Sequence, residues 1–264
     1  PIVMSIMLNA DETIRRPVPQ RVKFYTGGAP APAAVQAAMS ALNFDVMHAY
    51  GLTEAYGPSL ACFEQEEWKT LSFDEKAEFT KRQGVPHVTA GDSRVIDPET
   101  MKEVPWDGRT IGEIMQRSNT IMVGYYKNEY ATAKAFKDGW FHTGDLAVMH
   151  PDGYIEVKDR SKDIIISGGE NISSVEIENA LYKHDAVLAV GVVAKHDEKW
   201  GEIPCAFVEL KDGAHVSEEE LLEFARTHLA GFKRPKQIIF GELPKTSTGK
   251  IQKFMLRSRV RENG

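Results

Sequence analysis

Short runs of apolar residues, separated by turn-forming residues, recur along the whole chain. Runs typical of β-strands lie at residues 22–26, 44–50, 164–166, 187–193, 203–210 and 238–240. Helical patterns lie at residues 175–182 and 218–229. Strands that alternate with helices predict an α/β arrangement at the start of the chain, the end of a parallel-sheet subdomain. The last third predicts a compact α+β unit with a small sheet.

Between these parts, residues 85–160 have a β-rich pattern. Turn signals occur at Asp97-Pro98, Asp107-Gly108 and Asp152-Gly153. Short strands separated by such turns predict a small antiparallel, barrel-like subdomain. The sequence thus divides into an α/β part (1–84), a β-rich part (85–160) and a small α+β domain (161–264), joined to the rest by a polar step.

The Asp152-Gly153 pair lies between two alternating runs and predicts a β-hairpin. If these are its two turn residues, His150 pairs with Ile155 and Asp145 pairs with Arg160. A carboxylate and a guanidinium would then lie side by side at the open end. The alternative is an ordinary surface salt bridge, which contributes at most about 1 kcal/mol.

Three serines precede helical patterns with a glutamate three residues later, the spacing of a capping box. These pairs are Ser72 and Glu75, Ser173 and Glu176, and Ser217 and Glu220. The first opens a short helix in the charged stretch 64–84, where a solvated surface helix is the favoured interpretation.

Composition narrows the class of protein. The chain has 264 residues, of which 42% are hydrophobic and 27% charged, and its net charge is −6. An acidic chain argues against a nucleic-acid-binding protein. Cys62 and Cys205 are far apart and form no metal-ligand pattern, which predicts a reducing compartment and a cytoplasmic location. The longest candidate membrane stretch, residues 1–8, is too short to span a bilayer.

Two glycine-bearing turns follow the first two predicted strands. Gly27-Gly28-Ala29-Pro30 follows the first, and Gly51-Leu52-Thr53-Glu54 follows the second, which ends at Tyr50. Open α/β sheets bind ligands at the carboxyl ends of their strands. An ordinary strand-to-helix connection fits these residues equally well. Ser247-Thr248-Gly249-Lys250 is not a nucleotide-binding P-loop, because Pro244 and Ile251 occupy positions where that motif requires Gly and Ser or Thr.

Four ordered motifs together resemble the acyl-adenylate-forming superfamily. They are FHTGD (141–145), DRSKD (159–163), SGGENISSVEIE (167–178) and LPKTSTGKIQK (243–253). This superfamily contains acyl-CoA synthetases, firefly luciferase and the adenylation domains of peptide synthetases. The resemblance covers nearly all of the chain. Members carry a phosphate loop upstream of the region where this sequence begins, so the chain resembles a downstream half. We expect it to need the upstream half of the same protein as a partner and to be inactive alone.

The resemblance implies roles for residues of the first part. Gly27, Gly28, Ala29 and Pro30 correspond to the segment that lines the adenine pocket, and Tyr50 and Gly51 to the motif that contacts adenine and phosphate. The Tyr50 ring could stack on adenine. Thr53 could donate to a phosphate oxygen, and Glu54 could bind Mg²⁺ that bridges the phosphates of ATP.

Other residues have roles implied later in the chain. Asp145 corresponds to the aspartate that binds the ribose hydroxyls, and Arg160 would orient it. The C-terminal domain is mobile in the family and swings about a hinge residue, here Lys162. Lys250 corresponds to the catalytic lysine that reaches the substrate carboxylate and the α-phosphate, while Gly168 and Gly169 would leave room for the pantetheine arm of CoA.

The reaction that the resemblance implies is the ATP-dependent activation of a small carboxylic acid as an acyl-adenylate, followed by transfer to CoA. The charged stretch 64–84 resembles an insertion found in ligases of short- and medium-chain acids. This resemblance implies a role in fatty acid metabolism. Alternatives are an adenylation domain that loads a carrier protein, a luciferase-like oxygenase, and a non-catalytic module that binds nucleotide or CoA.

Overall fold

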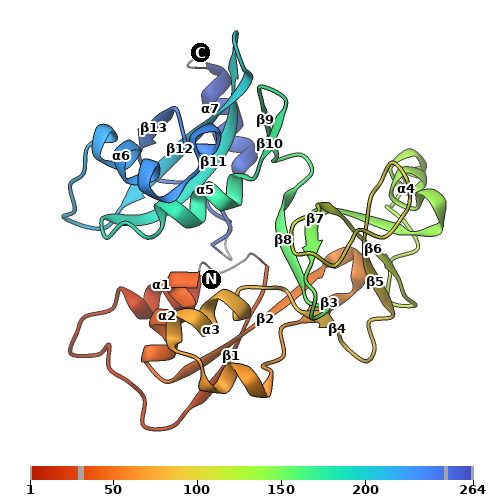
Figure 1. The fold of residues 1–264 in the computed structure, drawn as a ribbon, viewed down its shortest axis with the longest axis horizontal. Coiled ribbons are helices and arrows are strands. Elements are labelled where there is room, and N and C mark those ends of the chain that lie inside the picture. The colour runs from red at the N-terminus through yellow and green to blue at the C-terminus, as the bar shows by residue number, and fades with distance from the viewer. Residues whose placement is uncertain (1, 29–32, 247–248, 263–264) are drawn as a thin grey trace. The chain divides into compact units, whose positions relative to one another are not determined.

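Contacts between residues divide the chain into two units, Pro1–Lys158 and Asp159–Gly264 (Figure 1). The structure is a computed structural model that describes residues 2–28, 33–246 and 249–262. The boundary between the units lies two residues ahead of the predicted start of the second domain at residue 161. The predicted combination of an α/β part and an α+β part is confirmed.

The first sheet of the first unit is mixed. Its strands follow the order β1 (Val22–Thr26), β2 (Phe44–Leu52), β3 (Gly57–Ala61) and β4 (Val85–Pro86). The pair β1–β2 is parallel and is connected through helix α2 (Ala33–Ala41), whereas the other pairs are antiparallel. Helix α1 (Ile2–Leu8) and α2 bury Met4 and Met39 against this sheet. The sheet therefore contains the predicted parallel pair and turns antiparallel after β2.

The charged stretch between β3 and β4 folds into η2 (Glu66–Thr70) and α3 (Phe73–Thr80). The capping box of Ser72 and Glu75 is confirmed. The stretch is not purely solvated, because Trp68 is only 5% exposed. Its ring lies 5.1 Å from the rings of both Phe79 and Tyr154. An aromatic anchor therefore fixes this insertion to the first unit.

The β-rich part is an open sheet and not a closed barrel. Its strands follow the order β5 (Asp92–Ile96), β6 (Gly112–Arg117), β7 (Phe141–Met149) and β8 (Ile155–Arg160). Helix α4 (Glu129–Ala135) and the 3-10 turn η3 (Lys137–Gly139) connect β6 to β7. The sheet packs on β2 and β3 through a core that contains Tyr50, Leu60, Val95, Ile114, Ala147 and Met149.

The turn between β7 and β8 differs from the prediction by one residue. Gly153 N donates to His150 O at 2.9 Å, and His150 N donates to Tyr154 O at 2.9 Å. The turn thus contains three residues, Pro151 to Gly153, and His150 lies opposite Tyr154 and not Ile155. Gly153 has a φ of 82°, the left-handed conformation that closes three-residue hairpin loops.

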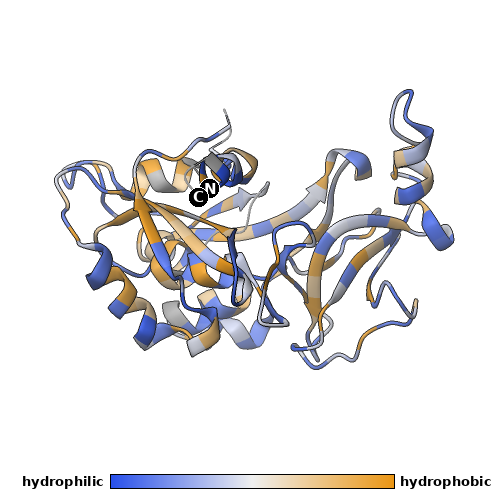
Figure 2. Ribbon diagram, turned by 90° about the horizontal axis from the view of Figure 1, so that it is seen from above, coloured by the Kyte–Doolittle hydropathy of each residue, from blue (hydrophilic) through white to orange (hydrophobic). Residues whose placement is uncertain are grey.

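The second unit contains a five-stranded sheet. Its members are β9 (Ile165–Ser167), β10 (Glu170–Ile172), β11 (Val187–Asp197), β12 (Gly201–Leu210) and β13 (Gln237–Phe240). Helices α5 (Ser174–Leu181) and α6 (Glu218–His228), followed by η4 (Gly231–Lys233), pack in one core. Helix α7 (Lys253–Glu262), absent from the sequence prediction, packs Leu256 and Val260 in a second core. Figure 2 shows hydrophobic colouring along the long strands, whereas the helices carry both colours.

Gly168 and Gly169 form a two-residue turn between β9 and β10, where the sequence predicted a loop. Their φ values are 59° and 88°, so both central residues are left-handed. This combination is typical of a tight hairpin turn. A Cβ on Gly168 would lie 2.9 Å from the ring of Trp200, so this position has no room for a side chain.

Replacing a core side chain of the second unit should destabilise that unit. Leu181 is fully buried among Ile177, Val190 and Leu221. We expect Leu181→Ala to lower the free energy of unfolding by about 2–5 kcal/mol, because it leaves a cavity. Hydrogen exchange of the β11 amides measures this loss. Ile166→Ala, on a residue that is 55% exposed, is the control and should cost less than about 0.5 kcal/mol. Equal losses in both variants would contradict the assigned core.

Candidate functional site

The carboxyl end of β2 carries four of the predicted site residues. Tyr50 and Gly51 belong to β2, and Thr53 and Glu54 begin the 3-10 turn η1 (Thr53–Ala55). A Cβ on Gly51 would lie 2.0 Å from Gly57 O, so glycine permits the close approach of β3 at this point. The chain therefore places a backbone turn and two polar side chains directly beside Tyr50.

Tyr50 and Asp145, 95 positions apart in the sequence, meet in the first unit. The Tyr50 hydroxyl donates to Asp145 Oδ2 at 2.7 Å. Tyr50 is 9% exposed and Asp145 is 5% exposed. The Tyr50 ring packs in the core where the two sheets meet, so the position of its hydroxyl is fixed by that packing. The fold thus brings together two residues that the sequence assigned to one nucleotide site.

A set of polar contacts holds the backbone around Asp145. Thr143 Oγ1 accepts from Asp145 N at 3.1 Å and donates to Ile114 O at 2.7 Å. Glu113 Oε1 accepts from Gly144 N at 2.8 Å, and Glu113 Oε2 lies 2.8 Å from His142 Nδ1. The sequence analysis gave no role to Glu113, and it included His142 and Thr143 only as letters of the motif FHTGD; all three take part in this network.

Glu54 is held by a segment that the sequence analysis did not single out. Its backbone oxygen accepts from Met122 N at 2.7 Å, and Oε1 accepts from the Tyr125 hydroxyl at 3.2 Å. Tyr125 N in turn donates to Thr132 Oγ1 at 2.9 Å. Partial burial and the negative charge of Glu54 raise the pKa of Tyr125. Tyr125 therefore stays protonated and able to donate to Glu54.

The first glycine turn lies at the neighbouring strand end. Gly27 follows β1, and a Cβ there would lie 2.8 Å from Ala49 O of β2. Gly28 has a φ of 86°. Glycine at position 27 permits the close approach of β2, and glycine at position 28 permits the left-handed backbone. Gly27 lies next to Ala49, the residue before Tyr50. Ala29 and Pro30 lie outside the described residues.

The predicted site residues of the second unit lie on turns and strand ends. Arg160 ends β8, and its backbone oxygen accepts from Asp163 N at 2.9 Å, which closes a turn around the exposed Lys162. Gly168 and Gly169 lie at the tip of the β9–β10 hairpin. Lys250 is exposed and precedes α7.

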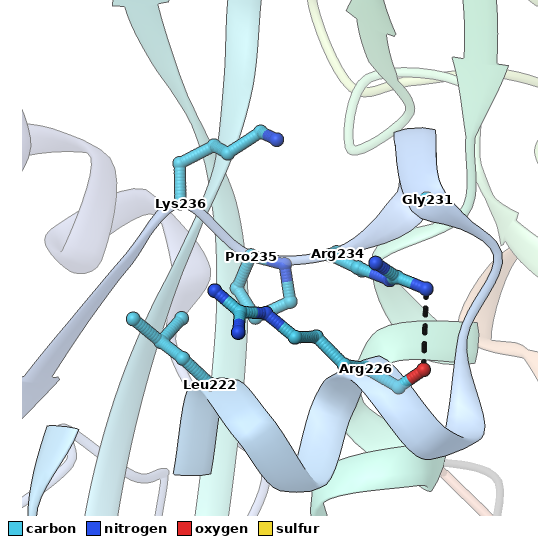
Figure 3. Close-up of a pocket in the computed structure, with 6 residues that line it drawn as sticks. All are labelled: Leu222, Arg226, Gly231, Arg234, Pro235 and Lys236. Carbon is cyan, nitrogen blue, oxygen red and sulfur yellow. Dashed lines mark hydrogen bonds between the residues drawn. The ribbon is translucent and has the colours of Figure 1, made fainter. Parts of the chain in front are cut away.

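A pocket of about 340 Å³ lies beside the C-terminal end of α6 (Figure 3). Its lining includes three cationic side chains, and the full set is Leu222, Arg226, Gly231, Arg234, Pro235 and Lys236. Arg234 donates through Nη2 to Arg226 O at 3.2 Å and through Nε to Leu229 O at 3.1 Å. These bonds fix the Arg234 guanidinium at the pocket wall.

Other kinds of site find no support in the described part of the chain. No three His, Cys, Asp or Glu side chains gather there as they would around a metal ion. Cys62 and Cys205 are free and buried, and burial raises their pKa values to about 12 and about 11, so neither thiol ionises readily. No helix between residues 2 and 262, gaps aside, has the length and apolar character needed to cross a membrane.

Two family models of AMP-binding enzymes match the chain. The family model described as AMP-binding enzyme matches residues 1–126, and the one described as AMP-binding enzyme C-terminal domain matches residues 176–250. The chain belongs to this family, which confirms the resemblance drawn from its motifs.

Its relatives include named CoA ligases. The whole chain is 52% identical to an acetate–CoA ligase of Humulus lupulus and 48% identical to a peroxisomal acetate/butyrate–CoA ligase of Arabidopsis thaliana, and it covers 48% of each. Among solved structures, an o-succinylbenzoate CoA synthetase of Bacillus subtilis, in complex with its acyl-adenylate intermediate, superposes with a TM-score of 0.76 at 29% identity. That match covers 97% of this chain and 48% of the synthetase. The chain thus spans about half the length of the curated relatives it matches.

Acid should destabilise the first unit through His48, which lies on β2 two residues before Tyr50. His48 is buried, and Gln83 Nε2 lies 3.1 Å from its Nδ1. Burial lowers its pKa to about 4, from 6.5 for an ordinary histidine. Between these values the unfolded chain binds a proton that the folded chain does not, so stability falls as the pH falls.

We expect the free energy of unfolding to be about 2 kcal/mol lower at pH 5 than at pH 7 from this group. Urea unfolding at the two pH values measures the change. His48→Gln should remove this part of the pH dependence, and a variant with the same dependence as the wild type would contradict the assignment.

Proposed function

We propose that this chain is the downstream part of an ATP-dependent acid–CoA ligase. In the reaction, a carboxylate oxygen attacks the α-phosphate of ATP, which forms an acyl-adenylate and releases pyrophosphate. The CoA thiol then attacks the acyl carbonyl, and AMP leaves. The observation that carries the proposal is the Tyr50–Asp145 contact beside Thr53 and Glu54, because it assembles the predicted nucleotide residues at one strand end.

In the first unit, Asp145 is the proposed ribose ligand. A carboxylate has about four lone-pair sites, so a bond to Tyr50 is compatible with bonds from ribose hydroxyls. Thr53 would donate to phosphate, while Gly27, Gly28, Ala29, Pro30 and Gly51 would allow the backbone to approach the nucleotide. The stacking role of the Tyr50 ring remains a prediction, since much of the ring packs in the core.

Glu54 is the proposed ligand of Mg²⁺. A single carboxylate, without further acidic ligands gathered around it among the described residues, fits an ion that is held mainly by ATP phosphates and water. Mg²⁺ would neutralise the charge on the phosphates. Tyr125 would keep the Glu54 carboxylate in place through its hydrogen bond.

In the second unit, Lys250 is the proposed catalytic cation. A flexible ammonium suits negative charge that develops between the attacking carboxylate and the α-phosphate. Arg160 would assist at the nucleotide, and Lys162, exposed on its turn, would serve as the hinge for domain alternation between the two steps. The two-glycine turn at 168–169 would leave room for pantetheine in the second step.

The cationic pocket beside α6 is the proposed contact for the phosphates of CoA. Arg226 and Lys236 both line it, and the Arg234 guanidinium is fixed at its wall. Phosphates favour arginine clusters of this kind. The CoA ligases among the relatives favour CoA over a carrier protein as the acyl acceptor.

The upstream half of the same protein is the proposed partner of the first unit. Strand β1 lies at the edge of its sheet and exposes Tyr25, and helix α1 exposes Val3 and Ile6. An unpaired edge strand beside exposed apolar side chains is suited to a further strand and its covering helices.

The proposed substrate is a small carboxylic acid, in fatty acid metabolism, because two relatives are named for acetate or acetate and butyrate. The proposed location is a reducing compartment, which the two free, buried cysteines support. The cytoplasm is one such compartment, whereas the Arabidopsis thaliana relative is named as a peroxisomal protein.

The first test uses the full-length product of the gene, Mg-ATP and a panel of acids from acetate to octanoate. We expect acid-dependent pyrophosphate release, and thioester formation once CoA is added. Lys250→Ala should slow acyl-adenylate formation at least about 100-fold, because the cation acts on charge that develops in that step. Thioester formation from supplied acyl-adenylate should change less than about twofold. Loss of both steps would contradict the role of Lys250, and no turnover with any acid would contradict the function.

A second test concerns the cationic pocket. Arg226→Ala and Lys236→Ala should each raise the KM for CoA about tenfold, the effect of losing one charge-assisted contact. The KM for ATP and the rate of pyrophosphate release should stay unchanged. Lys211→Ala, another exposed cation of the second unit, serves as the matched control. An unchanged KM for CoA in both pocket variants would exclude this pocket as the CoA contact.

A further inference from the structure

Residues 245–246 pair with residues 250–251, and we refer to these paired segments, which include Lys250, as the hairpin. Lys245 and Ile251 form an isolated antiparallel bridge. Thr246 N donates to Lys250 O at 2.8 Å, and Lys250 N donates to Thr246 Oγ1 at 3.1 Å. Because these bonds tie the two sides of the loop together, the position of Lys250 depends on where the ends of the hairpin are attached.

One end is attached to β12 through an ion pair. Lys245 Nζ lies 2.7 Å from Glu209 Oε2 and 3.0 Å from Oε1. Glu209 Oε2 also accepts from Leu243 N at 3.0 Å, so a single carboxylate binds both a side chain and the backbone ahead of the loop. Residues on both sides of Pro244 are thereby held against the sheet.

The other end is attached to α5 through a more deeply buried pair. Lys253 Nζ lies 2.8 Å from Glu178 Oε1 and donates to Ser174 Oγ at 2.5 Å. Glu178 Oε1 also accepts from Val192 N at 2.8 Å, and Ser174 donates through N and Oγ to Asp159 Oδ2 at 2.6 Å. The two side chains of the ion pair are only 15% and 14% exposed.

Burying this ion pair is unfavourable, because both charged groups lose their hydration. Apolar side chains at the same positions would not incur that penalty. Burial raises the pKa of Glu178; it also opposes the charge on Lys253, but the nearby carboxylates outweigh that effect and raise the pKa of Lys253. Leu256 and Val260 already provide an apolar face that packs α7. The ion pair therefore does more than stabilise the packing of α7. It fixes the position of Lys253, the first residue of α7, three residues after Lys250.

We propose that Glu209 with Lys245, and Glu178 with Lys253, act as positioning pairs that hold the two ends of the hairpin and thereby direct Lys250 during acid activation. The inference rests on the proposed function. The four residues do not touch substrate; they fix the backbone from which the Lys250 side chain extends.

The experiment compares three glutamate variants in the full-length protein. Glu178→Gln and Glu209→Gln each remove one positioning pair. Glu176→Gln is the matched control, because Glu176 also pairs with a lysine at 2.8 Å in the same unit, and that lysine, Lys233, belongs to η4 and not to the hairpin or α7. We expect the rate of acyl-adenylate formation to fall about 10- to 100-fold in the two test variants, the effect of misplacing a reacting group. The KM for ATP and thioester formation from supplied adenylate should change less than about twofold in all three.

A stability control separates positioning from simple unfolding. Glu178→Gln combined with Lys253→Met removes both charges and keeps an acceptor for Val192 N. We expect the melting temperature of this double variant to lie near that of the wild type, while adenylate formation stays slow.

Recovery of the wild-type rate in the double variant, or a parallel loss of both half-reactions in the single variants, would overturn the positioning role. So would test variants that behave like Glu176→Gln while the wild type is active. If the wild type forms no acyl-adenylate from any acid, the proposed function fails, and this inference fails with it.

Discussion

A hydrogen bond between the Tyr50 hydroxyl and the Asp145 carboxylate marks the place where the two sheets of the first unit meet. The Tyr50 ring lies in the shared core with Leu60 and Ile114, so apolar packing fixes the position of the hydroxyl. A buried carboxylate is unfavourable unless donors satisfy it, and the fold supplies that donor from the other sheet. The packing of the two sheets and the geometry of the site are therefore one constraint: sliding either sheet would leave a buried charge without this partner.

Local signals predicted the elements well, because their causes lie within a few residues. The serines at 72, 173 and 217 each accept from a backbone N–H three residues later, which only a helix start requires. Turns were predicted less well where two solutions compete. Asp152-Gly153 suggested a two-residue turn, but Pro151 before them suits a three-residue turn that ends at the left-handed Gly153. The two glycines at 168–169 predict a loop, whereas the structure has a tight hairpin turn, which uses the same backbone freedom.

Contacts between distant residues could not be predicted from any local pattern. The family motifs pointed to Asp145 and Glu54, yet Glu113, which holds the backbone before Asp145, and Tyr125, which binds Glu54, carry no signal of their own. Trp68 sits in a charged stretch that looks solvated, and only its packing against Phe79 and Tyr154 shows that it is an anchor. Buried ion pairs cannot be predicted for the same reason. A lysine is expected to be exposed unless its partner is known.

The buried polar groups of the two units have different proposed roles. In the first unit, Asp145 and its neighbours present a rigid acceptor, which suits a nucleotide that must bind in one orientation. In the second, the ion pair of Glu178 and Lys253 is largely buried, whereas Lys250, the proposed catalytic cation, is exposed. A lysine that stabilises developing negative charge needs a mobile side chain, but it also needs a backbone that is held in a fixed position. In the proposed arrangement, the ion pairs hold the ends of the hairpin and Lys250 stays exposed, which would satisfy both requirements.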